Sequence, residues 1–188
     1  MRIGVLKEPA NENRVSLVPE SVKKLVKIGF EVVIETDAGR NSHNIDHDYL
    51  SAGASVSPRS EAMSCEIVIC IAPPDITKMD AGQILVCVAD PFRNPDNVRV
   101  AVSKGISLMS MDMIPRRLSR AQAMDVNSSQ DNLAGYKAVL IGSAHVPRGI
   151  PMMTTSAGTV RPCKFVIMGL SLIHISEPTR PLYLSYAV

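Results

Sequence analysis

Short runs of apolar residues recur along the chain, and each is the length of a buried strand. They predict strands at residues 3–6, 32–34, 67–72, 84–89, 106–109 and 165–168. Between them, residues 19–28 and 96–104 place apolar side chains near one face of a helix, and Gly29 and Gly105 follow as helix ends. Strands that alternate with helices predict an α/β fold, with a mostly parallel, Rossmann-like or flavodoxin-like sheet and flanking helices.

The second half of the chain has a different pattern. Residues 119–141 contain no proline and predict a long helix, although Asn127, Ser128, Ser129 and Gly135 are poor residues for its interior. A kink or a functional site would account for them. Residues 146–162 are rich in Pro and Gly and predict a connector. We therefore expect a first domain at residues 1–137, then a linker and the first strand of a second domain at 138–169.

Composition excludes several classes of protein. Hydrophobic residues make up 46% of the 188 residues and charged residues 20%, so the bulk of the chain is not disordered. The net charge is +2 and the basic residues are scattered, which argues against a nucleic-acid partner. The apolar runs are far shorter than the roughly 20 residues of a membrane helix, so no direct membrane insertion is expected. The start of the chain resembles no targeting sequence, which makes the cytoplasm the expected compartment.

Cysteine and histidine give no metal signal. The four Cys residues show no CxxC spacing, and three lie in or beside apolar runs, so we expect reduced, structural thiols. His43 and His47, with Asp46 and Asp48, are more typical of a polar loop before a short helix at residues 49–50 than of a metal site. No metal is therefore expected.

A dinucleotide-binding chain of this class should carry GxGxxG after a strand, because glycine lets the backbone approach a pyrophosphate. The sequence has no such motif, and its eleven Gly residues include no pair closer than seven positions. Residues 164–169 (KFVIMG) nevertheless look like the strand that leads into that loop. The residues after it, 170–180 (LSLIHISEPTR), resemble the conceptual translation of a transposase-type sequencing-library adaptor. We therefore expect a truncated second Rossmann domain, with residues 170–188 as an artefactual tail outside the fold.

Two blocks of residues carry a family resemblance. Residues 4–8 (GVLKE) and 11–15 (NENRV), with Pro19 and Gly29, resemble the opening of the alanine dehydrogenase and pyridine nucleotide transhydrogenase family. Residues 119–125 (SRAQAMD) and 132–139 (NLAGYKAV) resemble its transhydrogenase alpha-subunit branch. The resemblance implies direct hydride transfer between NADH and NADP. It also implies a homodimer that works with NADP-binding and membrane-spanning subunits and so is cytoplasmic but peripheral to the inner membrane.

Chemistry separates the two branches. An amino-acid dehydrogenase needs a Lys or Arg to hold a carboxylate and a group such as His to move a proton. In that branch these residues lie on the two central strands, whereas residues 67–72 and 84–89 contain neither Lys nor His. Hydride transfer between two nicotinamides moves no substrate proton, so the transhydrogenase needs no catalytic acid or base. An amino-acid dehydrogenase and a non-catalytic interaction domain remain the alternatives.

The resemblance also places the NAD-binding residues. By it, Arg117 or its neighbour Arg116, Gln122, Asp125 and Ser128 hold the nicotinamide and ribose of NAD(H). Gln and Ser can bond a carboxamide, while Arg and Asp can pair and fix the loop. The alternative is that these are surface residues of a helix that is kinked at Ser128. Arg14, near Glu8 and Glu12, is either an ion-pair anchor or a remnant of the family's anion-binding position.

Overall fold

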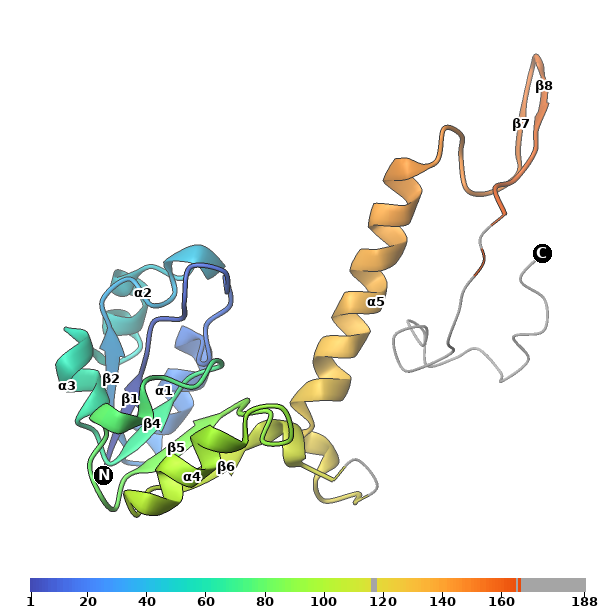
Figure 1. The fold of residues 1–188 in the computed structure, drawn as a ribbon. Helices are drawn as coiled ribbons and strands as arrows, with labels where there is room; N and C mark the ends of the chain where they lie inside the picture. Colours follow the sequence, from blue (N-terminus) through green and yellow to red (C-terminus); the bar gives the residue numbers. More distant parts are fainter. Residues whose placement is uncertain (116–117, 165, 167–188) are drawn as a thin grey trace. The chain divides into compact units, whose positions relative to one another are not determined.

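The computed structural model describes residues 1–115, 118–164 and 166, and within them the chain divides into two compact units, Met1–Ile114 and Pro115–Val188. The first unit is built on a six-stranded, fully parallel sheet in the order β3-β2-β1-β4-β5-β6 (Figure 1). Its strands are β1 (Arg2–Val5), β2 (Glu31–Glu35), β3 (Ser55–Ser57), β4 (Ile67–Ile69), β5 (Ile84–Cys87) and β6 (Ser107–Ser110). The α/β fold with a parallel sheet is therefore confirmed.

Helices cover both faces of this sheet. They are α1 (Pro19–Lys27), α2 (Asp46–Ser51), α3 (Arg59–Met63) and α4 (Pro95–Ser103), with short 3-10 turns η1 (Arg40–Ser42), η2 (Ile76–Lys78) and η3 (Met111–Met113). One core cluster joins Val22 of α1 and Tyr49 of α2 to β1 and β2. The other joins Ala62 of α3 and Ala101 of α4 to β4 and β5. Each face of the sheet thus has its own apolar core.

The local signals at the helix ends act as the sequence predicts. Pro19 occupies the first turn of α1, where its missing N–H costs no hydrogen bond. Gly29 and Gly105 follow α1 and α4 with φ angles of 98° and 68°, a region that glycine enters without strain. Two elements were not predicted, β3 and α3, because each is very short and β3 contains only one apolar residue, Val56.

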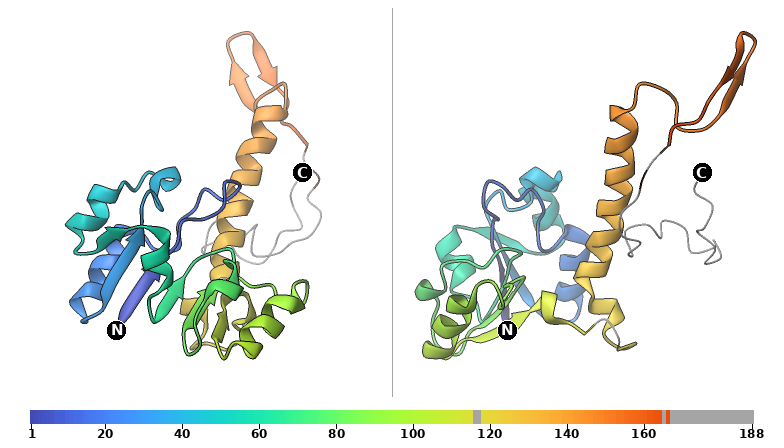
Figure 2. Two further views of the ribbon diagram at one scale, coloured as in Figure 1. Left: turned by 60° about the vertical axis from the view of Figure 1, so that its left-hand side comes forward. Right: turned by 45° about the vertical axis from the view of Figure 1, so that its right-hand side comes forward.

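The second unit contains one long helix and a hairpin. A 3-10 turn, η4 (Gln122–Met124), precedes α5 (Val126–His145), and β7 (Met153–Thr155) pairs with β8 (Gly158–Val160) in antiparallel fashion (Figure 2). The predicted helix start at residue 119 is wrong because Asp125 caps α5. The connector prediction is also wrong in part, since residues 153–160 form the hairpin.

The remaining predictions for this half stay untested. The strand at residues 165–168 and the tail at 170–188 lie outside the described residues, apart from Val166. The domain boundary near residue 137 stays a prediction, and α5 runs through that position without a break. Among the residues the structure describes, no helix is long and apolar enough to cross a bilayer.

Candidate functional site

Asp125 organises the turn that holds three of the four predicted NAD-binding residues. Its carboxylate Oδ1 accepts a hydrogen bond from the backbone N–H of Ser128 at 2.9 Å, and its Oδ2 accepts one from the Ser128 hydroxyl. The Ser129 hydroxyl donates to the Asp125 carbonyl oxygen at 3.0 Å. Asp125 is only 8% exposed. It is therefore the N-cap of α5, and this explains Ser128 and Ser129, which sit in the first helical turn and not in a helix interior.

Gln122 lies on η4, directly before this cap. Its carbonyl oxygen accepts a hydrogen bond from the Asp125 N–H at 3.2 Å, and its side chain is exposed. Ala121 beside it is buried, and its N–H donates to the Leu118 carbonyl oxygen at 2.8 Å. The turn is thus fixed by its own backbone bonds, which leaves the Gln122 amide on the surface.

The structure brings Asp125 and Ser128 into contact and places Gln122 one turn before them. Arg116 and Arg117 lie outside the described residues, so the predicted pairing of an Arg with Asp125 stays a prediction. An exposed primary amide supplies both a donor and an acceptor, and the Ser128 hydroxyl keeps acceptor capacity after it donates to Asp125. This pair of groups matches the donor and acceptor of a nicotinamide carboxamide, so the residues present fit the nicotinamide end of NAD.

Arg14 forms a bidentate ion pair with Glu12 in the first unit. Its Nη2 lies 2.6 Å from Glu12 Oε2, and its Nε donates to Glu12 Oε1 at 2.9 Å. These hydrogen bonds from Arg14 lower the pKa of Glu12 to about 2. The contacts favour the ion-pair anchor over the anion-binding alternative.

The central strands end in a pair of buried thiols. Cys70 and Cys87 follow the last paired residues of β4 and β5, and the ladder continues there through the Cys70 N–H bond to the Val86 carbonyl oxygen at 3.1 Å. A hydrogen bond with Cys87 and burial raise the pKa of the Cys70 thiol well above its ordinary range. All cysteines among the described residues are free, and Cys65, Cys70 and Cys87 are buried, which fits structural thiols.

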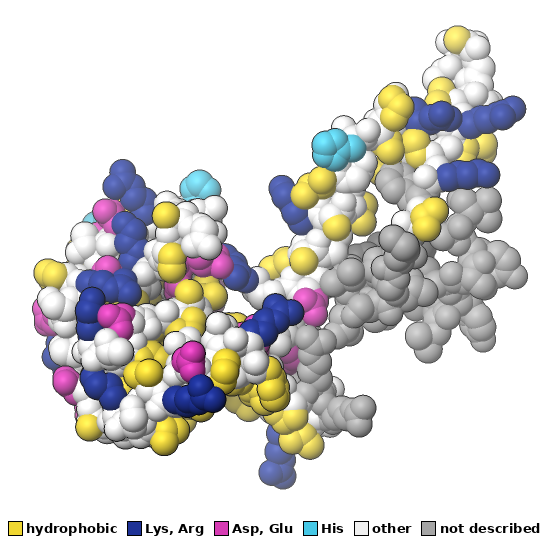
Figure 3. All heavy atoms as spheres, viewed as in Figure 1, with side chains coloured by type: hydrophobic (Ala, Val, Ile, Leu, Met, Phe, Trp, Pro, Cys, Tyr) yellow, Lys and Arg dark blue, Asp and Glu magenta, His cyan; other side chains and the backbone are white. Residues whose placement is uncertain are grey.

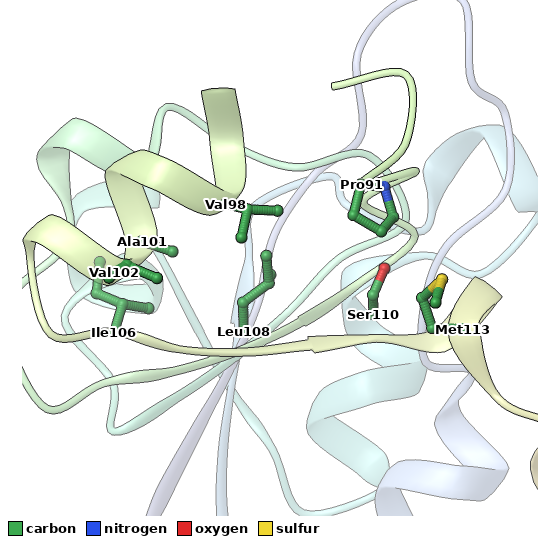
Figure 4. Close-up of a pocket in the computed structure, with 8 residues that line it drawn as sticks. All are labelled: Pro91, Val98, Ala101, Val102, Ile106, Leu108, Ser110 and Met113. Carbon is green, nitrogen blue, oxygen red and sulfur yellow. The ribbon is translucent and has the colours of Figure 1, made fainter. Parts of the chain in front are cut away.

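A cavity of about 350 Å³ lies between α4 and β6 (Figure 4). Its wall is apolar apart from Ser110 and consists of Pro91, Val98, Ala101, Val102, Ile106, Leu108, Ser110 and Met113. None of the predicted site residues lines it. Elsewhere in the described part, His43 and His47 belong to no cluster of three or more metal-ligating side chains.

Comparison with known proteins identifies the family. Residues 4–134 match the family described as "Alanine dehydrogenase/PNT, N-terminal domain", so the chain belongs to this family. Within it, the chain is 37% identical over 183 residues to the first of the separate chains that make up NAD(P) transhydrogenase subunit alpha in Rhodospirillum rubrum, covering 92% of this chain and 47% of that protein. The chain thus spans about half the length of the curated relatives that it matches.

Solved structures agree with this assignment. A transhydrogenase from Sinorhizobium meliloti superimposes with a TM-score of 0.86 at 37% identity, over 92% of this chain and 53% of that one. An L-alanine dehydrogenase superimposes with a TM-score of 0.70 at 30% identity, over 77% of this chain and 40% of that one. The fold is that of the N-terminal region of a transhydrogenase alpha subunit.

Proposed function

We propose that this chain is the N-terminal part of a proton-translocating NAD(P) transhydrogenase alpha subunit, which passes a hydride between NADH and NADP. The observation that most supports this is the turn at residues 122–128, in which the Asp125 cap fixes the backbone and leaves the Gln122 amide exposed. The transhydrogenase alpha-subunit blocks predicted from the sequence include this turn.

The chain's own residues position and do not react. NAD(H) supplies the hydride when it is bound. Gln122 donates to and accepts from the carboxamide, and Ser128 adds a second polar contact at the same turn. Asp125 acts as a positioning residue, because its two bonds to Ser128 hold the turn in one geometry. No side chain of this turn is required to move a proton, because direct hydride transfer between two nicotinamide rings requires none.

The alternative is an amino-acid dehydrogenase, which the similarity to an L-alanine dehydrogenase keeps open. Residues 67–72 and 84–89, at the ends of β4 and β5, contain neither the Lys nor the His that such an enzyme needs. These two strand ends therefore favour transhydrogenation.

Partners follow from the same proposal. The NADP is held by a second subunit, and membrane-spanning subunits couple the transfer to proton movement, so the protein works in the cytoplasm at the inner membrane. A homodimer is also proposed. The exposed apolar side chains of α5, which are Leu133, Tyr136, Val139, Leu140 and Ile141, support the existence of covering partners (Figure 3).

The test is made on the full-length gene product mixed with an NADP-binding subunit. We expect hydride transfer from NADH to a nicotinamide acceptor and no alanine-dependent formation of NADH. Gln122→Asn keeps the amide but shortens its reach, so the transfer rate should fall on the order of 100-fold with little change in NADH affinity. Gln130→Asn, one turn into α5, is the matched control and should leave the rate unchanged. Equal rates for Gln122→Asn and the wild type would remove this turn from the mechanism.

Residues 1–188 alone are expected to bind NADH weakly and to be inactive. The sequence contains no Gly-rich loop, and the backbone of such a loop with the helix N-terminus behind it supplies most of the affinity for a pyrophosphate. Calorimetry on this chain checks the expectation, and micromolar affinity would contradict it.

A further inference from the structure

The sheet of the first unit reverses its strand order between β1 and β4. The order β3-β2-β1-β4-β5-β6 runs outward in both directions from this pair of neighbouring strands (Figure 1). In open α/β sheets, the loops at such a reversal diverge, and the crevice outside the carboxyl ends of the strands is where ligands bind. In this chain the crevice lies between the loop after β1 and the loop after β4.

The side chain of Glu8 occupies this crevice. It comes three residues after the end of β1, and its Oε1 accepts a hydrogen bond from the Ile71 N–H at 2.6 Å. Its Oε2 accepts a second one from the Ala72 N–H at 2.9 Å. Ile71 and Ala72 are successive residues in the loop after β4, so both oxygens of one carboxylate are bound by a pair of adjacent peptide groups. Glu8 is 9% exposed, which makes it one of the few buried charged side chains among the described residues.

The surroundings suit a negative charge. Hydrogen bonds to an ionised acceptor are shorter and stronger than neutral ones, and the 2.6 Å bond is of this kind. Arg14 lies close enough for its charge to interact with that of Glu8. The guanidinium of Arg14 is itself held by Glu12, a second carboxylate of the same loop. The cationic side chain nearest in the loop is therefore also bound by the chain's own carboxylate.

We propose that the Ile71 and Ala72 peptide groups form a carboxylate-binding site at the reversal point of the sheet, and that the chain fills it with Glu8. The first unit carries its own ligand at the position where related sheet topologies take an external one. Two consequences follow. The wild-type crevice is closed to external anions, and removal of the Glu8 side chain opens a site for a small monocarboxylate such as formate. This proposal does not depend on the proposed hydride transfer.

The test compares the wild type with Glu8→Gly, both as residues 1–188, by thermal unfolding in sodium formate and in sodium chloride at equal ionic strength. The variant loses two charge-assisted bonds, so its Tm should fall by roughly 10 °C. Formate should restore part of this loss and saturate, while chloride should not. The matched control, Val68→Ala, removes buried apolar volume from β4 and should lower Tm without any formate-specific recovery. No recovery of Glu8→Gly, or the same response in Val68→Ala, would overturn the proposal.

Amide signals give a second measurement on the same molecules. In proton–nitrogen correlation spectra, formate should shift the Ile71 and Ala72 signals of Glu8→Gly and leave those of the wild type in place. Glu8→Gln keeps the shape of the side chain but loses the charge and one acceptor oxygen. We expect upfield movement of at least one of the two amide protons and no response to formate. If Glu8→Gly is unfolded in chloride, refolding in formate supports the site; unchanged amide shifts in Glu8→Gln overturn it.

Discussion

The two units use the same kinds of apolar residue in opposite ways. In the described part of the chain, every buried hydrophobic residue except Ala121 lies between Ile3 and Ile106. In α5, by contrast, Gly135 is the one buried residue, while Leu133 and Val139 are each 60% exposed. The first unit therefore completes its own core, whereas α5 presents a surface that other chain segments must cover.

The difference begins in the sequence of the helices. α1 carries Val22 toward the core and exposes charged residues such as Lys23 and Lys24. In α5 the residues from Leu133 to Ile141 are apolar at most positions, and they surround the helix. A helix that is apolar all round is typical of a buried environment. The comparison teaches that α5 was selected for contacts beyond those that the described residues supply.

Adding one methyl group should separate the units most sharply. A Cβ at Gly4 would overlap the carbonyl oxygen of Ala62, because α3 packs directly on β1. Backbone cannot move as a side chain can, so we expect Gly4→Ala to destabilise the first unit by more than about 4 kcal/mol. At Gly149, in the second unit, the same methyl group meets the flexible end of Met153. Gly149→Ala should change the free energy of unfolding by less than about 0.5 kcal/mol.

Urea denaturation followed by far-ultraviolet circular dichroism checks this pair. Equal denaturation midpoints for Gly4→Ala and the wild type would mean that α3 does not pack on β1 as the structure shows.

The sequence predicts the parts of the fold that depend on local pattern. Five apolar runs and the two helices bounded by Pro and Gly are found within a few residues of their predicted positions. Strand order and the Glu8 contact are different, because the latter joins residues that are 63 positions apart. No periodicity encodes such a contact. The short β3 is held by its pairing with β2, so its own residues carry little signal.

The candidate site was predictable in a similar degree. Asp125 three residues before Ser128 is a common N-cap spacing, and it could have corrected the predicted helix start. The exposure of the Gln122 amide depends on the burial of Ala121 and on η4, which the sequence pattern does not reveal. Family resemblance, rather than local pattern, pointed to Gln122.

Truncation of a leucine should give the next largest difference between the units. Leu85 in β5 is fully buried, so Leu85→Ala removes core contacts and should cost about 3–5 kcal/mol. Leu140 in α5 is 46% exposed, and Leu140→Ala should cost less than about 1 kcal/mol in this chain. Denaturation midpoints measure both values. A cost for Leu140→Ala close to that for Leu85→Ala would show that α5 is already covered, for example by a second copy of the chain.

Removal of a tyrosine hydroxyl is the mildest test and adds a dependence on pH. The buried Tyr49 hydroxyl donates to the Leu17 carbonyl oxygen at 2.9 Å, and Tyr49→Phe should cost about 1 kcal/mol at pH 7. Burial raises the pKa of Tyr49 to about 12 from an ordinary value of about 10. Its hydroxyl therefore stays protonated in the folded state at a pH where it ionises in the unfolded state.

The sign of the pH effect follows from that shift. The contribution of Tyr49 to stability is complete below about pH 10 and is lost as the pH rises from about 10 to about 12. The wild type should thus lose stability faster than Tyr49→Phe over this interval, and the difference between them should narrow. Tyr136→Phe is the matched control, because the Tyr136 side chain is exposed on α5 and its loss should have little effect at pH 7. A constant difference between the wild type and Tyr49→Phe from pH 9 to pH 12 would show that the hydroxyl of Tyr49 ionises equally in both states.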